Sequence, residues 1–509
     1  MGLYRYTASA DNTISNAFRS NLTGRATGSN MGAADVLEAF YIVGQTSGSS
    51  GLSSEKSRIL INFPFSEIET DRSSSSPHIP SSGNVSWYLR MFNARHATTL
   101  PKKFFMSVEP ISSSWQEGDG LDMDEYTDQT YGVLSGSNWT VSSLGTNWTN
   151  TGGDFISDNS NYTPSQYFNN GTEDLEIDVT HVVEQMLHGS GSGLERNGFV
   201  VKLSGSYETG SQTYYTKKFF SRSSEYFFKK PSLEARWDSS EKDNAASFYL
   251  SSALAPSDDN VNTLYMYNYV RGQLTDIPGL TDNILDVSLF SGSSDNSAPT
   301  GTALPLPEGA GVSSDGSTAA VGGKISTGIY TASLVYPAVS SSITTVFPVW
   351  NKSGTQYHTG SAIYVKLFNA SNMNPNPQYV SKITNLKSSY SRDEKARFRL
   401  YVREKDWNPT IYTVANSNIE SQIIEDAYYR IYRIVDDSEI IAYGTGSATS
   451  PQQTGSAGSY TRLSYDISGN YFDLDMDILE SGYSYGLKFS YYTNGRYAEQ
   501  SEVFKFRVD

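Results

Sequence analysis

Apolar and polar side chains alternate along most of this chain, and this two-residue period constrains the fold more than any other feature of the sequence. In the run 395–403, Phe398, Leu400 and Val402 alternate with arginines and a tyrosine. Successive side chains of an extended chain point to opposite faces, so the alternation predicts strands with one buried and one solvated face. Similar short runs recur between clusters of Gly, Ser, Asn and Pro. The sequence therefore predicts an all-β fold.

The chain is too long for one hydrophobic core, because at 509 residues it exceeds the size at which single cores stop growing. A polar, turn-prone stretch begins at about residue 238 and marks a boundary. A second change comes at about residue 387, where the alternation becomes stricter. We predict three β-sandwich domains in tandem: an N-terminal jelly roll at 1–238, a middle β-sandwich at 239–386 and a C-terminal immunoglobulin/fibronectin-III-like sandwich at 387–509.

One segment of the first half follows a helical period instead. Between residues 179 and 187, apolar side chains fall at positions 182, 183, 186 and 187, which form one stripe of a helix. Thr180 is the expected N-cap, and Gly189 follows the last apolar position. We predict a short helix here.

Two signals near the C-terminus concern topology. Leu479, Gly482 and Tyr485 have the Leu-x-x-Gly-x-x-Tyr spacing that resembles the tyrosine corner of fibronectin type III and related sandwiches. In that corner the tyrosine hydroxyl bonds back to the backbone; the alternative is that Tyr485 is one core aromatic among 36 tyrosines. Farther along, Asn494-Gly495 predicts a tight turn between strands at 485–492 and 501–508.

Charge and composition exclude several classes of function. Lys and Arg number 38 against 54 Asp and Glu, so the net charge is −16 and the surface repels phosphate backbones and anionic membranes. The chain has no cysteine, which excludes disulfides, thiolate metal sites and thiol nucleophiles. No signal-peptide pattern or long apolar segment is present. We expect cytoplasmic synthesis, no nucleic-acid partner and no membrane insertion.

An acidic loop is the only candidate metal site in the sequence. Glu117, Asp119, Asp122 and Asp124 offer the carboxylate oxygens that Ca²⁺ prefers, although the full spacing of a calcium loop is missing. The alternative is a merely solvated loop. The five histidines lack metal-ligand spacing, and neither a phosphate loop nor a nucleophile elbow is present. We therefore expect a non-enzyme with no cofactor other than this possible calcium ion.

Five segments of about the first 220 residues resemble, in order and spacing, the DNRLRE-type module, a jelly roll of bacterial surface and carbohydrate-associated proteins. These segments are 10–15, 57–63, 108–118, 175–180 and 197–203. The resemblance implies the fold of the N-terminal domain and says little about its function, because one fold hosts many functions.

Two further segments, 230–240 and 262–274, resemble virion structural proteins of contractile-tailed bacteriophages of the T-even-like, cyanobacterial type. This resemblance covers most of the chain. It implies a non-enzymatic component of the virion, made in the host cytoplasm and peripheral on the tail, neck or baseplate. Its partners would be other virion proteins and further copies of itself in an oligomer. No catalytic residues are implied.

Two other functions remain open from the sequence. A glycan-binding adhesin would stack a host surface sugar on aromatic side chains near strand-end loops, for which Trp139, Trp148 and Tyr162 are candidates. Clustered exposed indoles would favour this function, whereas burial of Trp139 and Trp148 would remove it. A polysaccharide-degrading enzyme would need two carboxylates facing each other across a cleft at about 5 to 10 Å.

Overall fold

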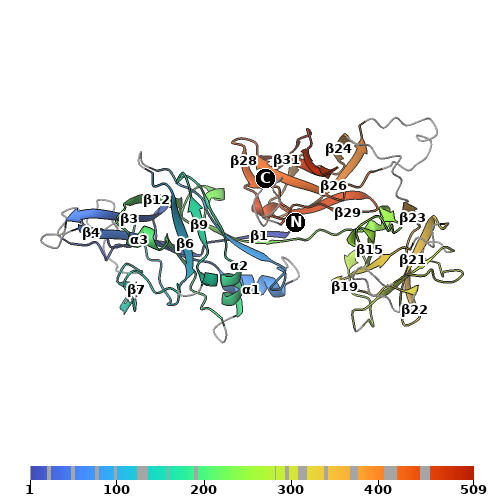
Figure 1. Cartoon of the computed structure of the whole chain (residues 1–509), viewed down its shortest axis with the longest axis horizontal. Helices are drawn as coiled ribbons and strands as arrows, with labels where there is room; N and C mark the ends of the chain where they lie inside the picture. Colours follow the sequence, from blue (N-terminus) through green and yellow to red (C-terminus); the bar gives the residue numbers. More distant parts are fainter. Residues whose placement is uncertain are drawn as a thin grey trace. The chain divides into compact units, whose positions relative to one another are not determined.

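The computed structural model of the chain describes residues 2–19, 24–46, 52–74, 79–96, 100–122, 136–157, 160–188, 193–280, 282–292, 297–307, 318–337, 342–366, 377–405, 421–446 and 459–509. Strands organised in several sheets dominate this part of the chain, which confirms the all-β, multi-sandwich prediction (Figure 1). The chain divides into two compact units. The first is Gly2–Asp238 with Gly458–Tyr460, and the second is Ser239–Ala457 with Thr461–Asp509.

The first unit is a sandwich of two antiparallel sheets. One sheet has the order β1-β13-β5-β10, and the other has the order β12-β3-β4-β11-β6-β9 with β2 beside β4. The strands are β1 (Gly2–Thr7), β2 (Ala10–Ser15), β3 (Val36–Thr46), β4 (Leu52–Asn62), β5 (Ser86–Met91), β6 (Phe104–Pro110), β9 (Ser165–Phe168), β10 (Leu175–Asp178), β11 (Phe199–Leu203), β12 (Tyr214–Phe220) and β13 (Ser232–Trp237). A small separate hairpin joins β7 (Val141–Ser143) to β8 (Thr146–Asn147).

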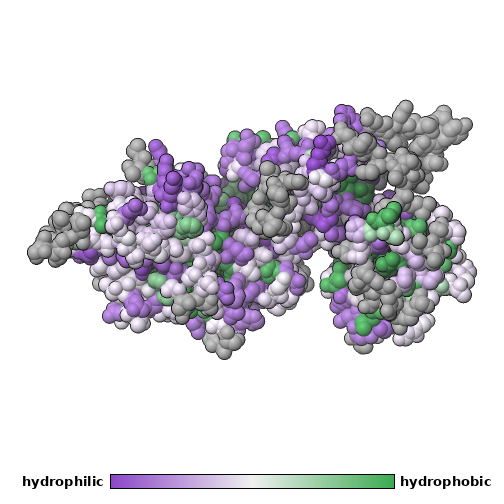
Figure 2. Space-filling model, in the orientation of Figure 1, coloured by the Kyte–Doolittle hydropathy of each residue, from purple (hydrophilic) through white to green (hydrophobic). Residues whose placement is uncertain are grey.

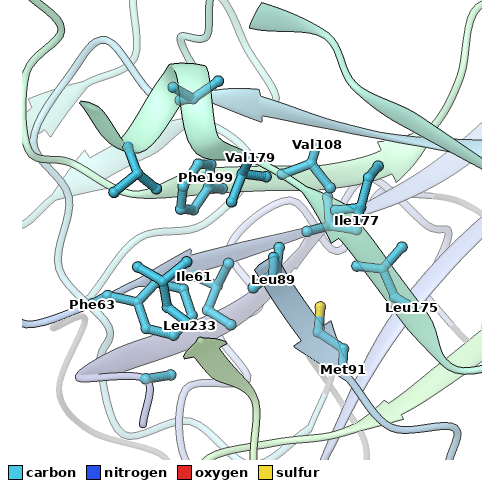
Figure 3. Close-up of a cluster of buried hydrophobic side chains, with 14 of the residues drawn as sticks. Ile61, Phe63, Leu89, Met91, Val108, Leu175, Ile177, Val179, Phe199 and Leu233 are labelled. Atoms are coloured by element: carbon cyan, nitrogen blue, oxygen red, sulfur yellow. The ribbon is translucent and has the colours of Figure 1, made fainter. Parts of the chain in front are cut away.

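The apolar faces of these two sheets meet in one core. Figure 3 shows side chains of both sheets in a single cluster, among them Ile61 and Phe199 from one sheet and Leu89 and Leu233 from the other. These positions follow the two-residue period, because alternate residues of each strand face inwards. Full burial of such a side chain contributes roughly 1.5–3 kcal/mol.

The predicted helix is confirmed as α2 (Thr180–His188), whose Val182, Val183 and Met186 are buried. The predicted N-cap role of Thr180 is wrong. Its hydroxyl accepts the backbone N–H of Trp87 on β5 at 2.8 Å, and its own N–H donates to the Asp178 carboxylate at 2.9 Å. The threonine therefore ties the helix to the neighbouring strand.

A second helix, α1 (Phe65–Ser73), was not predicted from the sequence. It buries only Phe65 and Ile68, so its helical period is too weak to detect. Shorter helical turns are α3 (Ser206–Thr209), η1 (Ser160–Tyr162), η2 (Phe227–Lys229), η3 (Asn244–Ala246), η4 (Asp258–Asn260) and η8 (Met476–Ile478). None of the helices in the described part of the chain has the length and apolar character needed to span a membrane.

The second unit contains two sandwiches whose strands belong to separate sheets. The middle sandwich, as we call strands β14 to β23, has sheets β14-β23-β21-β18 with β22 on β21, β15-β20-β19, and the hairpin β16-β17. Its strands are β14 (Phe248–Tyr249), β15 (Val261–Tyr267), β16 (Tyr269–Val270), β17 (Gln273–Leu274), β18 (Asp286–Phe290), β19 (Gly322–Ser326), β20 (Ile329–Val335), β21 (Thr345–Lys352), β22 (Thr355–Thr359) and β23 (Ile363–Lys366).

Two seams join the sheets of the middle sandwich. At one seam the Asn262 side chain takes the place of a backbone partner: its Oδ1 accepts the Tyr249 N–H and its Nδ2 donates to the Tyr249 carbonyl, both at 2.9 Å. At the other, Val287 and Ala320 exchange backbone hydrogen bonds of 2.9 and 2.8 Å. Neither seam follows a local sequence pattern.

The C-terminal sandwich, as we call strands β24 to β33, has sheets β24-β26-β30-β29 and β25-β33-β31-β27-β28, with β32 on β31. Its strands are β24 (Tyr379–Ile383), β25 (Ser389–Tyr390), β26 (Lys395–Glu404), β27 (Ala427–Arg433), β28 (Ser438–Ile441), β29 (Ser464–Asp466), β30 (Gly469–Asp475), β31 (Ser484–Thr493), β32 (Arg496–Glu499) and β33 (Phe504–Val508).

The tyrosine corner is confirmed. The fully buried Tyr485 donates its hydroxyl hydrogen to the Glu480 carbonyl at 2.7 Å. Asn494 and Gly495 have φ angles of 52° and 78°, as a tight turn requires, but this turn joins β31 directly to β32 rather than to the strand predicted at 501–508. That last strand, β33, pairs with the other half of β31.

The chain enters the second unit along β29, with which it forms one isolated bridge. Lys242 and Tyr465 form a parallel bridge, in which the Tyr465 N–H donates to the Glu241 carbonyl at 2.9 Å and the Asp243 N–H donates to the Tyr465 carbonyl at 3.0 Å. The polar stretch that begins at residue 238 is therefore paired with the C-terminal sandwich before it leads into the middle sandwich.

Candidate functional site

The acidic loop uses Glu117 in an ion pair. Both carboxylate oxygens of Glu117 accept from the Arg222 guanidinium, at 2.5 and 2.6 Å, and one also accepts the Asp11 N–H at 2.9 Å. A guanidinium at this distance repels a divalent cation, which argues against Glu117 as a metal ligand. Asp119 and Asp122 lie farther along the loop, and Asp124 falls outside the described residues. No group of three His, Asp or Glu side chains suited to a metal ion occurs among the residues that the structure describes.

Trp139 and Trp148 are buried, with exposed fractions of 7% and 5%. They cover Leu60 and Val200 on the outer face of the larger sheet of the first unit. The Trp148 indole N–H donates to the Asn138 carbonyl at 2.8 Å. The strands β4 and β11 carry apolar residues on both faces, so the segment 136–157 must cover the outer face. These indoles offer no open face to a sugar, which removes the proposed role of both.

Tyr162 does not share a surface with these tryptophans. It lies in η1 and packs against the main core of the first unit, whereas the indoles belong to the separate cluster on the outer face. Its ring stacks on His181 with 5.3 Å between ring centroids. The three sequence candidates for glycan binding are therefore not brought together.

Lys217 on β12 is a fully buried basic group of the first unit. Burial lowers its pKa to about 8. Its ammonium donates to Asn93 Oδ1 at 2.5 Å and to the carbonyls of Gly171 and Glu173 at 2.9 and 2.8 Å. Three acceptors use all three N–H donors, so this lysine connects strand and loop.

A cavity of about 930 Å³ in the second unit is the best candidate for a binding site. Its walls come from η3, from β14, η4 and β15 in the middle sandwich, and from β24, β26, β29, β31 and the segment 421–425 in the C-terminal sandwich. Most of the described residues that line it are polar, including Asn244, Tyr249, Tyr379, Gln422 and Glu425. The volume lies within the range of about 300–1,000 Å³ that is usual for ligand sites.

Hydrogen bonds fix the walls of this cavity. Asn244 Oδ1 accepts the Thr263 N–H at 2.9 Å, and Asn244 Nδ2 donates to the Tyr465 hydroxyl at 3.3 Å. Behind the lining residues Gln422, Ile423 and Glu425, the Asn470 side chain pairs with both backbone groups of Ile424, at 2.9 and 2.8 Å. The amide of Asn470 therefore fixes the backbone of the segment 421–425, just as the amide of Asn262 fixes the backbone of Tyr249.

Glu425 is the most perturbed carboxylate of the lining. The surrounding protein desolvates it and the neighbouring Asp426 repels it, so its pKa is raised, although the side chain remains exposed in the cavity. Arg462 bonds the Asp426 carboxylate and donates to the Glu425 carbonyl at 3.3 Å. This arrangement gives Glu425 a larger protonated fraction than an ordinary surface carboxylate.

A smaller groove of about 330 Å³ continues from the cavity. Both hollows are lined by Pro377, Tyr379, Thr493 and Asn494, and the groove then follows the edges of β24 and β32. The lining residues extend from Lys242 to Glu502, and no local motif connects them. Sequence reasoning therefore missed this site, since only the folded chain brings these segments together.

No protein-family model matches this sequence, and no curated protein is similar to it at a significant level.

Proposed function

We propose that the chain is a non-enzymatic structural component of a contractile-tailed phage particle, peripheral on the tail, neck or baseplate, and that it acts through protein–protein contacts. The resemblance of segments 230–240 and 262–274 to virion structural proteins supports this function. An all-β architecture of two compact units is compatible with a structural role in a particle. The partners are copies of the same chain and neighbouring virion proteins.

An exposed aliphatic patch on the middle sandwich carries the proposal. Ile284, Val321 and Ile325 have exposed fractions of 37%, 36% and 52%, and Ile284 lies opposite Gly323 across an antiparallel bridge. We call these three side chains the β19 patch. Figure 2 shows hydrophobic surface at the position of β19. Solvent-facing positions of a sheet usually hold polar residues, and exposed apolar patches commonly mark contact surfaces.

Size-exclusion chromatography with light scattering on the full chain, followed by negative-stain imaging, tests the proposal. We expect a defined symmetric oligomer, and we expect the double variant V321S/I325S to shift it towards monomer. The variant Y364S removes an exposed tyrosine from β23 of the same sandwich and should leave the oligomer unchanged. A wild-type chain that stays monomeric and does not assemble with other particle proteins would contradict the proposal.

A further inference from the structure

We propose that the cavity of the second unit, together with its adjoining groove, is a binding site for a neutral oligosaccharide. Trp139, Trp148 and Tyr162 are not among the described residues that line this site, and the inference does not depend on the particle role proposed above.

The shape of the hollow suits a chain of linked units. The cavity of about 930 Å³ and the groove of about 330 Å³ share four lining residues, so they form one continuous depression. Tyr379 lies at their junction. A ligand longer than a single sugar would occupy the cavity and extend along the groove.

The lining offers the groups that recognise a polyhydroxylated ring. Side-chain amides and carboxylates of Gln422, Asn494, Glu404 and Glu425 line the cavity and are of the types that donate to and accept from hydroxyl groups. Tyr379 contributes an amphipathic ring, which combines a flat apolar face with a polar hydroxyl. A few polar groups that fix orientation, beside aromatic faces, are what a small-ligand site requires.

The charge of the lining selects a neutral ligand. The described residues that line the cavity and the groove include four cations, Lys242, Lys405, Arg462 and Arg496, and five carboxylates, Asp259, Glu404, Glu425, Glu499 and Glu502. Recognition of phosphate, sulfate or carboxylate needs a surplus of cations, preferably a free arginine fork. Arg462 is bonded to Asp426. Anionic polymers are therefore disfavoured.

A peptide fits this site less well than a sugar. An extended peptide that adds to a sheet edge is selected by apolar pockets for its alternate side chains, and the described lining is mainly polar. The exposed edge of β24 also carries Lys382 and follows Pro377. Lysine and proline at an edge discourage the addition of another strand.

The site is organised before a ligand arrives. Asn262 holds Tyr249, Asn470 holds Ile424, and the Gln422 N–H donates to the Val402 carbonyl at 2.8 Å. Binding therefore orders few protein groups, which leaves more of the contact energy for affinity. Desolvation raises the pKa of Glu425, and the protonated form of this carboxyl group can donate a hydrogen bond as well as accept one.

Saturation-transfer NMR and calorimetry on the full chain test the inference with maltohexaose, cellohexaose and laminarihexaose as neutral probes. Hexagalacturonate serves as an anionic probe and a tryptic digest of casein as a peptide probe. We expect wild-type protein to bind at least one neutral hexasaccharide. We expect Y379A and E425A each to weaken that binding at least tenfold, while Y379F retains it.

Two matched controls separate binding from folding. Y364A removes an exposed tyrosine and E225A an exposed glutamate, both outside the lining, and neither should change the affinity. Tyr379 also packs edge-on against Tyr491, whereas the exposed Glu425 side chain accepts a long hydrogen bond of 3.4 Å from the Ser247 hydroxyl, so E425A is the second, independent variant. The inference is overturned if no neutral probe binds, if E425A and Y379A bind as tightly as wild type, or if binding is confined to hexagalacturonate or to casein peptides.

Discussion

Tyr267 and Tyr471 donate their hydroxyl hydrogen bonds to the same carboxylate oxygen, Oε2 of Glu241, at 3.1 and 2.6 Å. Tyr267 lies on β15 of the middle sandwich, and Tyr471 lies on β30 of the C-terminal sandwich. Burial, reinforced by the Glu241 charge, raises the pKa of both phenols, so both remain donors at every physiological pH. One carboxylate therefore links the two sandwiches of the second unit.

Replacing Glu241 should weaken that link. E241A leaves two part-buried hydroxyls without their acceptor, and hydrogen bonds to charged groups contribute about 1.5–3 kcal/mol each. We expect calorimetry to show a lower melting temperature for the second unit and a separation of its unfolding into two transitions. E225A, a substitution of an exposed glutamate, is the control. A single unshifted transition in E241A would show that the link contributes little.

Asp243 should make the second unit less stable as the pH rises. Burial raises the pKa of this carboxyl group to about 7. A group with a higher pKa in the folded than in the unfolded chain contributes its stability below about pH 4, and that contribution is lost as the pH rises towards 7. We expect D243N to match wild type near pH 4 and to melt at a higher temperature than wild type at pH 8.

Melting curves of both proteins between pH 4 and 8 measure this effect. D473N, at an exposed aspartate that pairs with Arg397, should change the melting temperature only slightly at any of these pH values. Parallel pH profiles for D243N and wild type would contradict the assignment to Asp243.

The tyrosine corner should contribute measurably to the C-terminal sandwich. Y485F removes the hydroxyl that bonds the Glu480 carbonyl and leaves that part-buried acceptor unpaired, at a cost of about 1–3 kcal/mol. Y483F alters an exposed tyrosine two residues away and should stay within about 0.5 kcal/mol of wild type. Chemical unfolding followed by circular dichroism distinguishes the two. If Y485F and Y483F lose equal amounts of unfolding free energy, the hydrogen bond from the Tyr485 hydroxyl is not what stabilises the corner.

Calcium should leave the stability of the first unit unchanged, because the Glu117 carboxylate is already paired with the Arg222 guanidinium. We expect the same melting temperature in EDTA and in millimolar CaCl₂. E117A should melt lower in both, since Arg222 loses its partner. A rise in melting temperature with calcium that disappears in E117A would restore the metal hypothesis.

Local patterns allowed the strands and the tyrosine corner to be predicted, since each depends on residues a few positions apart. Phe398, Leu400 and Val402 are buried as their alternation requires. The roles of Trp139 and Trp148 could not be predicted, because an indole suits an exposed stacking face and a core equally well. Only the segment that covers β4 and β11 decides between these roles.

The candidate cavity was beyond prediction for a different reason. Its two walls come from segments more than a hundred residues apart, and its geometry depends on Asn262 and Asn470, whose amides imitate backbone groups. Asparagine in a strand ordinarily weakens the prediction of that strand. Hydrogen bonds between an asparagine side chain and the backbone of a distant segment cannot be predicted until the position of that segment is known.

The parallel bridge between Lys242 and Tyr465 holds the start of the second unit against β29. Its bonds are formed by the main chain, so they do not depend on which side chains occupy the segment. Substitutions other than proline should therefore leave these main-chain bonds in place, whereas the link to Tyr267 and Tyr471 still depends on the side chain of Glu241. A pull along the chain at this point would load both main-chain hydrogen bonds together, even though the composition of the segment is that of a flexible linker.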